Sequence, residues 1–400
     1  MRTPIPAFSL LLLSAAFAAA AVPELRMRAQ TIDPKIQIGY GLAVADVDGD
    51  GRADILLADA KQIVWYRAPD WRKFVMAENL TAKDNVCIAA RDLDGDGKAE
   101  VAVGAEWNPS DTVGSGAVFL LEAPADRTQR WTPRRLPHEP TTHRMFWVRT
   151  GERRFGLAVL PLHGRGNKNG AGEGVQLHAY GWPWKEGDRG VPLMPTTPAL
   201  HLTHNFDLLP AASGGAAETL LLATKEGLRL VDPAKADAVP ATFTTVPAGE
   251  VRAGRLAGGA RFLATIEPMH GNAAAVYPVP AGAATDLTAR RILLDDTLVQ
   301  GHGLAVADLL GNGSDQIVVG WRGGTPGAKV GIRVFAAGDA QGATWRLLAT
   351  VDDNTMAVED LKVADLDGDG RPEIIAAGRA TKNVIIYWNE TARAPAPARE

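Results

Sequence analysis

Residues 41–58 read GLAVADVDGDGRADILLA, and the same pattern returns three more times along the chain. The other copies are IAARDLDGDGKAEVAVG at 88–104, GLAVADLLGNGSDQIVVG at 303–320 and LKVADLDGDGRPEIIAAG at 361–378. Each copy is an apolar run, a turn that is mostly aspartate or asparagine and glycine, and a second apolar run, which predicts a β-hairpin. A hairpin that recurs along a chain as a structural unit indicates a β-propeller.

Three weaker copies fill the long gap between the second and third clear hairpins. Together the seven copies place the starts of the innermost strands near Gly39, Asn85, Thr142, Thr203, Glu250, Gly301 and Val358. We therefore expect an all-β fold, a seven-bladed β-propeller, over residues 22–391. The last blade is one strand short after 384–388, so residues 25–32 are expected to close the ring as its outer strand and leave no open edge. Eight blades, or two separate sheets, are the alternative arrangements.

The two ends of the chain differ from the repeats. Arg2 precedes an apolar, alanine-rich run at 8–21, which is typical of a cleaved secretory signal (residues 1–21) and is short for a membrane span. This predicts a periplasmic or secreted protein with no membrane span after signal cleavage. Residues 392–400 alternate alanine, proline and charges, and are expected to be disordered.

Charge and cysteine content exclude several classes of function. The formal net charge is −4 and no basic patch stands out, so we expect no nucleic-acid partner. The single cysteine, Cys87, cannot form an intrachain disulfide and lies in an apolar strand, where it is expected to be a small core residue.

The turns of the hairpins carry carboxylates at alternating positions, which indicates Ca²⁺ binding. Calcium takes about six to eight oxygen ligands, and clustered acids without a cation would repel one another. The predicted ligands are Asp46, Asp48, Asp50 and Asp54 in the first loop, Asp92, Asp94, Asp96 and Glu100 in the second, and Asp365, Asp367, Asp369 and Glu373 in the last. The loop at 308–316 keeps Asp308 and Asn312 but has Leu310 and Gln316, so we expect weak binding or none there.

These hairpins resemble the FG-GAP/VCBS repeats of calcium-loaded propellers, the kind found in integrin α-chain heads. The resemblance implies the fold and the calcium, and leaves the function open because this fold supports many activities.

Histidines gather at the other face of the predicted ring. Each inner strand runs toward its acidic loop, so the start of the strand lies at the opposite face, beside the central channel. His302 precedes Asp308 by the same offset as Tyr40 precedes Asp46 and Glu359 precedes Asp365. By looser alignment, the same face receives His143, His204 and Arg252 from inner strands, and Trp107, His163, His270, Trp321 and Arg322 from return loops.

Five of the eight histidines thus converge on consecutive blades. Neutral imidazoles from several strands, with a carboxylate nearby, are ligands for Zn²⁺ or another divalent transition metal. They are equally a source of general acids and bases. A polar channel lining filled with water is the alternative interpretation.

Four short motifs on this face are 203–206 (THNF), 267–272 (EPMHGN), 301–304 (GHGL) and 320–322 (GWR). They resemble the propeller domain of the aldos-2-ulose dehydratase family, in which the propeller houses a metal-dependent dehydration of keto-sugars. The resemblance implies a carbon–oxygen lyase. Under this hypothesis His204, His270 and His302 hold the metal, His143 is the base, and Arg322 or Arg252 holds developing negative charge. Substrate binding falls to Tyr40, Trp107, His163, Trp321 and Glu359.

The alternative function is a non-catalytic calcium propeller that binds a glycan or a protein partner. It needs only the acidic loops and an exposed face with Trp107, Trp321 and Arg322. Hydrolysis and phosphotransfer are disfavoured, because the chain has no Gly-x-Ser-x-Gly elbow and no phosphate-binding loop.

Overall fold

The computed structural model describes residues 24–392 except 168–169, 198, 211–215, 281–285 and 326. The predicted signal peptide (1–21) and residues 393–400 of the predicted tail lie outside the described residues. Within the described part of the chain, no helix has the length and apolar character needed to cross a membrane.

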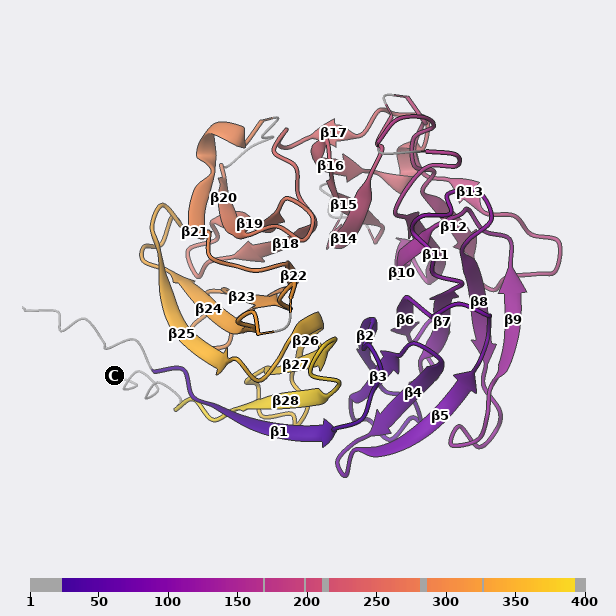
Figure 1. The fold of residues 1–400 in the computed structure, drawn as a ribbon, viewed down its shortest axis with the longest axis horizontal. Helices are drawn as coiled ribbons and strands as arrows, with labels where there is room; N and C mark the ends of the chain where they lie inside the picture. Colours follow the sequence, from indigo (N-terminus) through magenta and orange to yellow (C-terminus); the bar gives the residue numbers. More distant parts are fainter. Residues whose placement is uncertain are drawn as a thin grey trace, which may run out of the picture.

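Seven four-stranded antiparallel sheets are arranged as a ring around a central channel (Figure 1). This confirms the prediction of an all-β, seven-bladed propeller. The only helices in the described residues are two 3₁₀ turns, η1 (Pro233–Lys235) and η2 (Thr288–Arg290).

The blades follow one another along the chain, each from its inner to its outer strand. Blades one and two consist of β2 (Gly41–Ala45), β3 (Asp54–Ala58), β4 (Gln62–Arg67), β5 (Arg72–Glu78), then β6 (Cys87–Arg91), β7 (Glu100–Ala105), β8 (Ala117–Glu122), β9 (Thr132–Leu136). Blades three and four consist of β10 (Thr142–Gly151), β11 (Arg154–Pro161), β12 (His178–Gly181), β13 (Val191–Pro192), then β14 (Thr203–Pro210), β15 (Glu218–Thr224), β16 (Gly227–Val231), β17 (Ala241–Thr242). Blades five and six consist of β18 (Glu250–Arg255), β19 (Arg261–Glu267), β20 (Ala273–Val279), β21 (Ile292–Asp295), then β22 (Gly301–Ala307), β23 (Gln316–Trp321), β24 (Gly331–Ala337), β25 (Trp345–Asp353). Blade seven consists of β26 (Val358–Ala364), β27 (Glu373–Gly378), β28 (Val384–Asn389) and β1 (Met27–Asp33).

The second strand of a blade is the most deeply buried, because it packs against the neighbouring blades on both of its faces. Every residue of β3, β23 and β27 is buried. This explains why the sequence after each acidic loop is a continuous apolar run and not an alternating one. Cys87 belongs to this core as a buried free thiol, as expected.

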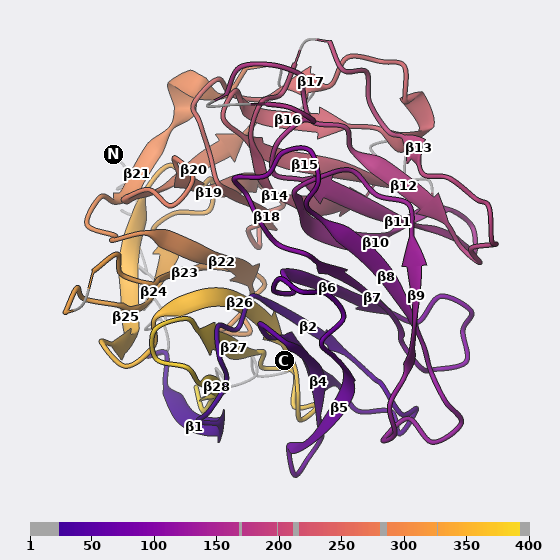
Figure 2. The same ribbon diagram turned by 45° about the vertical axis from the view of Figure 1, so that its right-hand side comes forward.

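The N-terminal strand closes the ring. Strand β1 pairs antiparallel with β28, so blade seven combines the two ends of the described chain (Figures 1 and 2). The backbone amide of Arg26 also donates to Thr391 Oγ1 over 3.1 Å. The predicted closure by residues 25–32 is therefore confirmed, with the strand beginning two residues later than expected.

Asp33, at the end of β1, fastens blade seven to blade one. Its carboxylate accepts hydrogen bonds from Tyr66 Oη over 2.8 Å, Lys73 Nζ over 2.8 Å and Lys35 N over 2.9 Å. Burial would raise the pKa of Asp33, but these hydrogen bonds outweigh burial and hold the pKa below its ordinary value. The ionised carboxylate therefore stabilises the closed ring at neutral pH.

Asp33→Asn is expected to lower the free energy of unfolding by about 1–3 kcal/mol at neutral pH, the range for hydrogen bonds to a charged group. Because the folded pKa is lowered, this contribution is present above the ordinary Asp pKa of about 3.9 and is lost as the pH falls through the lowered value. Urea unfolding of both proteins at neutral and acidic pH measures it, with exposed Asp70→Asn as the control. A difference that persists unchanged in acid would contradict the role of the ionised carboxylate.

Candidate functional site

Four of the seven inner strands carry a β-bulge at their second residue. In blade three the pairing passes from Thr142 opposite Pro161 to Arg144 opposite Leu160, which leaves His143 as the extra residue. A bulge turns a side chain out of the regular alternation, and bulges often lie next to functional sites. The extra residues of blades three, four, six and seven are His143, His204, His302 and Glu359.

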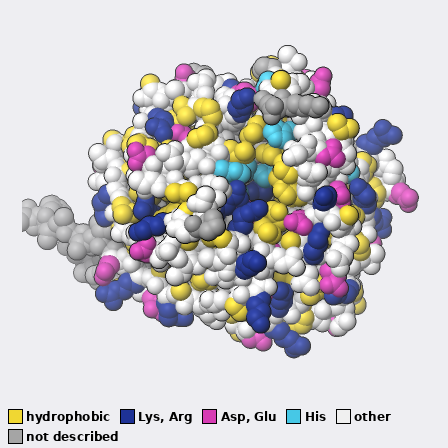
Figure 3. All heavy atoms as spheres, in the orientation of Figure 1, with side chains coloured by type: hydrophobic (Ala, Val, Ile, Leu, Met, Phe, Trp, Pro, Cys, Tyr) yellow, Lys and Arg dark blue, Asp and Glu magenta, His cyan; other side chains and the backbone are white. Residues whose placement is uncertain are grey.

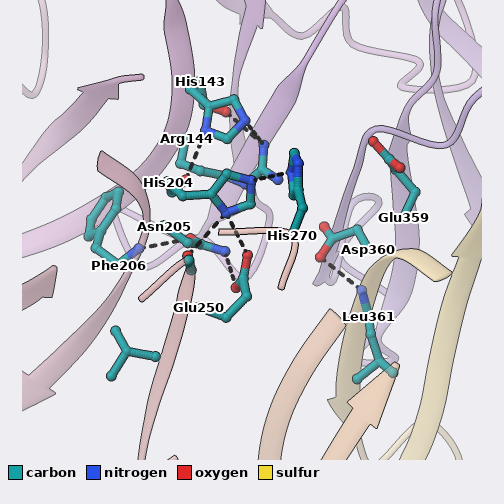
Figure 4. A network of polar contacts seen from close by, with 12 residues as sticks. His143, Arg144, His204, Asn205, Phe206, Glu250, His270, Glu359, Asp360 and Leu361 are labelled. Atoms are coloured by element: carbon teal, nitrogen blue, oxygen red, sulfur yellow. Dashed lines mark hydrogen bonds and ion pairs between the residues drawn. The ribbon is translucent and has the colours of Figure 1, made fainter. Parts of the chain in front are cut away.

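Three of the predicted histidines meet at this face. His204, His270 and His302 each offer a ring nitrogen within 4.8 Å of the other two. The Nε2 atoms of His204 and His270 are 3.1 Å apart. Figure 3 shows histidine side chains with Lys and Arg side chains in the hollowed centre of one face, and Figure 4 shows His204 and His270 pointing at each other.

His204 is fixed from behind by a buried acid. Its Nδ1 lies 3.0 Å from Glu250 Oε1 and 3.0 Å from the carbonyl oxygen of Gly249. Both neighbours are acceptors, so Nδ1 carries the proton and Nε2 keeps its lone pair toward His270. Glu250 in turn accepts a hydrogen bond from Asn205 Nδ2 over 2.6 Å. A carboxylate behind a histidine in this way is the usual support of a metal-ligating imidazole.

His270 lies in the loop between β19 and β20 in a conformation that suits few residues. Its φ is 53°, in the left-handed region, which costs on the order of 1–3 kcal/mol for a non-glycine residue and is concentrated at functional sites. Gly271 makes the turn possible, because a Cβ there would lie 2.1 Å from the carbonyl oxygen of Glu267. The turn formed by the EPMHGN motif therefore places the His270 ring in the cluster.

His302 has a buried ring nitrogen that lacks a partner. Its Nδ1 makes no hydrogen bond within the described residues, although the side chain is only 4% exposed. The glycines on both sides allow the close approach of neighbouring blades: a Cβ on Gly303 would lie 2.5 Å from Val358 Cγ1. Leaving a buried polar atom unsatisfied costs about 1–3 kcal/mol, which a bound ion would offset.

The four histidines of this face, His143, His204, His270 and His302, are neutral at physiological pH. Burial holds the pKa of His143 and of His302 well below the ordinary value, with the charge of Arg144 adding at His143 and that of Arg322 at His302. Burial also lowers the pKa of His204, and it lowers that of His270 to about 2. Neutral imidazoles are the form that binds metals.

A second cluster of charges lies beside the histidines. Arg322 Nη1 donates to Glu359 Oε2 over 2.6 Å, and Arg322 Nη2 is 3.4 Å from His270. Arg379 Nη1 donates to the other oxygen of Glu359 over 2.9 Å and lies over the ring of Tyr40. Glu359 therefore holds two guanidinium groups in place, and one of them, that of Arg322, lies against His270.

The structure does not favour His143 as a base. Its Nδ1 donates to the carbonyl oxygen of His204 over 2.8 Å, and its Nε2 accepts from Arg144 Nη1 over 3.2 Å. The lone pair that a base needs is already occupied, and the low pKa makes the ring a weak proton acceptor. The Trp107 ring packs against the same ring in a tilted arrangement, with centroids 4.9 Å apart. These contacts suit a residue that positions Arg144.

Other predicted residues are only partly brought to the cluster. Tyr40 reaches it through Arg379 and hydrogen-bonds to Asp84 over 3.3 Å. Arg252 lies 3.6 Å from Glu250 Oε2, so it faces the acid behind His204. His163 stays apart, with Nδ1 3.2 Å from the carbonyl oxygen of His201.

Trp321 corrects the prediction of an exposed aromatic face. The side chain is 5% exposed and packs in the core of blades five and six, under the guanidinium of Arg333. Its indole N–H donates to the carbonyl oxygen of Lys329 over 3.0 Å. Trp321 is the last residue of β23, and like the rest of that strand its side chain is buried.

Sequence reasoning missed two residues, Glu250 and Arg144. Counting along the strands from the acidic loops could have found both, because each lies within two residues of a residue that was placed on this face. Arg144 follows His143, and Glu250 begins the inner strand that carries Arg252.

The acidic loops lie at the other ends of the inner strands. The carboxylates of Asp46, Asp48 and Asp50, and likewise those of Asp92, Asp94 and Asp96, lie within 4.8 Å of one another. In the last loop the group is Asp365, Asp367 and Glu373. Each group could hold a cation.

The ninth-position acid of each of these three loops accepts a backbone hydrogen bond, and in the last loop Glu373 accepts from the amide of Leu366. Asp54 accepts from the backbone amides of Val47 and Ala68, and Glu100 from that of Leu93. Burial raises the pKa of Asp54, Glu100 and Glu373 to about 7, and neighbouring loop carboxylates add to the effect. In the last loop Asp369 is instead paired with Arg371. In each loop three of the four predicted acids lie within 4.8 Å of one another.

The comparisons with known proteins agree with this architecture. Residues 46–103 match the FG-GAP-like repeat and residues 88–121 the FG-GAP repeat. No curated protein matches the chain.

Solved structures match over the whole ring. A chain from the crystal structure of the mitotic checkpoint complex is 14% identical, with a TM-score of 0.58, and the match covers 98% of this chain and 100% of that chain. A chain from BBS1N in complex with ARL6DN, soaked with mercury, is 12% identical, with a TM-score of 0.55 over 93% and 99%. The Cps50 (Swd1) β-propeller domain of Myceliophteria thermophila is 12% identical, with a TM-score of 0.51 over 91% and 99%. At these identities the likeness shows the fold alone, so what the comparisons establish is a seven-bladed β-propeller that contains FG-GAP repeats in its first two blades.

Proposed function

We propose that the protein is an exported, calcium-loaded propeller that works as a metal-dependent lyase on an oxidised sugar. The transition metal binds to His204, His270 and His302. The observation that carries the proposal is the convergence of these three neutral imidazoles, together with the unpartnered buried Nδ1 of His302.

The donor set fits Zn²⁺ or a similar divalent ion. Zinc binds imidazole nitrogen at about 2.0–2.1 Å in tetrahedral geometry, which puts two ligand nitrogens roughly 3.3 Å apart. The 3.1 Å between the Nε2 atoms of His204 and His270 is close to that value. Three protein ligands leave one position open for a substrate, as in catalytic zinc sites.

The acidic loops fit Ca²⁺, a hard cation that prefers carboxylate oxygens. Three acids converge in each of three loops, far along the inner strands from the histidines. This arrangement supports a division of labour in which calcium stabilises the hairpins and the histidine metal serves chemistry.

Dehydration next to a carbonyl fits the groups around the histidines. A C–H bond adjacent to the carbonyl and the neighbouring C–O bond break, and a carbon–carbon double bond forms. The proton released from carbon ends on the departing hydroxyl group, so the net change is loss of water without oxidation or reduction. A divalent ion would polarise the substrate carbonyl as a Lewis acid. Arg322, held 3.4 Å from His270 by Glu359, is positioned to stabilise the negative charge that develops on oxygen.

A second candidate is glycan binding without catalysis. A pocket of about 270 Å³ between blades two and three is lined by Trp131, Trp182 and Trp184, with Arg134 over the Trp184 ring. Aromatic rings beside charged planar groups suit a sugar ring. This pocket lies away from the histidines, so substitutions in the cluster would leave such binding unchanged.

Turnover of keto-sugars by the metal-loaded protein tests the proposal. The mature protein is stripped with a chelator, reloaded with Ca²⁺ alone or with Ca²⁺ and Zn²⁺, and incubated with a panel of keto-sugars and keto-sugar acids. We expect the ultraviolet absorbance of a conjugated enone to appear only with the transition metal. If no member of the panel loses water in either state, the lyase proposal fails and the binding candidate becomes the better account.

A further inference from the structure

We propose that the substrate of the histidine site carries an anionic group, a carboxylate or a phosphate, and that the guanidinium of Arg144 binds it. This inference rests on the proposed function, since it names the class of oxidised sugar that the site takes. It begins with Arg144, which forms no ion pair with a carboxylate of the described residues.

Arg144 is the arginine of this face without an ion-pair partner. Its Nη1 donates to the carbonyl oxygen of His143 over 3.0 Å and to His143 Nε2 over 3.2 Å. Within the described residues, Nε and Nη2 make no hydrogen bond and no carboxylate forms an ion pair with the group. The other guanidinium groups are matched: Arg322 and Arg379 share Glu359, and Arg252 faces Glu250.

The free edge of Arg144 has the shape that a carboxylate needs. With Nη1 fixed by His143, the unused Nε and Nη2 form one side of the planar fork, which can donate two parallel hydrogen bonds. His143 fixes this orientation because its Nδ1 is bonded to the carbonyl oxygen of His204 and its Nε2 faces the arginine. His143 is thus a positioning residue for the arginine.

The guanidinium lies among the histidines of the proposed metal centre. Figure 4 shows Arg144 reaching between His143 and His270. Its charge lowers the pKa of His143, His204, His270 and His302, and it acts on the carboxylate of Asp360 as well. An anion on Arg144 would therefore lie beside the histidines of the proposed metal centre.

The local charge balance also calls for an anion. The groups that act on these histidines, or pair with those that do, are four cations against two carboxylates. The cations are Arg144, Arg252, Arg322 and Arg379, and the carboxylates are Glu250 and Glu359. The surplus is two positive charges, and a divalent ion would raise it to four. Partly buried charges carry a desolvation cost that an opposite charge offsets.

Binding to two matched sugars tests the inference. Glucosone and 2-ketogluconate differ only in an aldehyde against a carboxylate at the first carbon, and fructose 6-phosphate together with inorganic phosphate serves for the phosphate arm. Affinities are measured by calorimetry on the zinc- and calcium-loaded protein, in the wild type, Arg144→Gln and Arg144→Lys. Arg149→Gln, an exposed arginine of the same strand, is the control.

We expect the wild type to bind 2-ketogluconate or the phosphate probes at least about 10-fold more tightly than glucosone, with an advantage that weakens in high salt. Arg144→Gln should lose about 10- to 100-fold for the anion and nothing for glucosone, with its zinc content unchanged. Arg144→Lys keeps the charge without the fork, so it should retain part of the preference. Preference for the carboxylate over the phosphate probes identifies a sugar acid as substrate, and the reverse identifies a sugar phosphate.

Equal affinity of the wild type for the neutral and anionic sugars would overturn the inference, as would an anion preference that Arg144→Gln retains. The two proposals fail separately. If the protein dehydrates a neutral keto-sugar and shows no preference for anions, the lyase proposal holds and the inference that Arg144 binds an anion fails. If the protein holds no transition metal but binds anions in a way that depends on Arg144, the inference about Arg144 holds and the lyase proposal fails.

Discussion

His270→Ala is expected to deprive the purified protein of its transition metal while the calcium remains. A zinc site contributes about 10–16 kcal/mol over its ligands, so one of three histidines accounts for about 4 kcal/mol, on the order of a 1,000-fold loss of affinity. Element-resolved metal analysis of the mature chain measures the outcome. The wild type should hold about one transition-metal ion per chain.

The chain offers matched controls for this result. His163 lies on the same face but outside the cluster, so His163→Ala should keep the metal. His204→Ala should lose it and also unfold more easily than His270→Ala, because it removes the partner of the buried Glu250 carboxylate. If the wild type contains calcium alone, or if His270→Ala keeps the wild-type amount of transition metal, the histidine centre is wrong.

Removal of calcium is expected to lower the free energy of unfolding by several kcal/mol. A ligand that binds only the folded state adds about 2.7 kcal/mol at a concentration 100 times its Kd, so three loops add about 8 kcal/mol together. Thermal unfolding in EGTA and in excess CaCl₂ gives the difference. Asp46→Asn should lose about one third of it, because the amide replaces a ligand of one loop.

The loop at 308–316, which is expected to bind calcium weakly or not at all, supplies the control for the calcium prediction. Asp308 accepts from the amides of Asn312 and Gly313, much as Asp46 accepts from those of Gly49 and Gly51. Asp308→Asn therefore changes the same local hydrogen bonds in a loop whose ninth position is Gln316. It should leave the calcium-dependent stabilisation intact. Stability that does not respond to EGTA would refute calcium binding by the loops.

The repeats made the ring and its two faces predictable. Each acidic loop fixes the end of an inner strand, and counting back from it places the start of that strand at the opposite face. His302 and Glu359 were placed in this way. His204 was placed by looser alignment of a blade that lacks the acidic loop, and His270 from the return loop of blade five. The closing strand followed from an unpaired segment at one end and an incomplete blade at the other.

The bulges could not be predicted from the sequence. A bulge exists only relative to the partner strand, and the chain does not show that Thr203 and Asn205 face adjacent residues of β15. The partners of the His143 ring could not be predicted for a related reason, because its tautomer is set by a carbonyl of the next blade. The face on which Trp321 lies depends on how blades five and six pack, which no local pattern encodes.

The position of the ring closure gives the two halves of the site different histories during folding. His204, His270 and His302 belong to one uninterrupted stretch of chain on blades four to six, so they can assemble from neighbouring blades as these stack. The contact of Arg379 with the Tyr40 ring crosses between blades seven and one. Blade seven is itself closed by the pairing of Met27 in β1 with Asn389 in β28. Contacts so distant in sequence form late because their loop entropy must be offset first. A ring that opens transiently between blades seven and one would keep the three clustered histidines and the hydrogen bonds of Glu359 with Arg322 and Arg379, and would separate Tyr40 from Arg379.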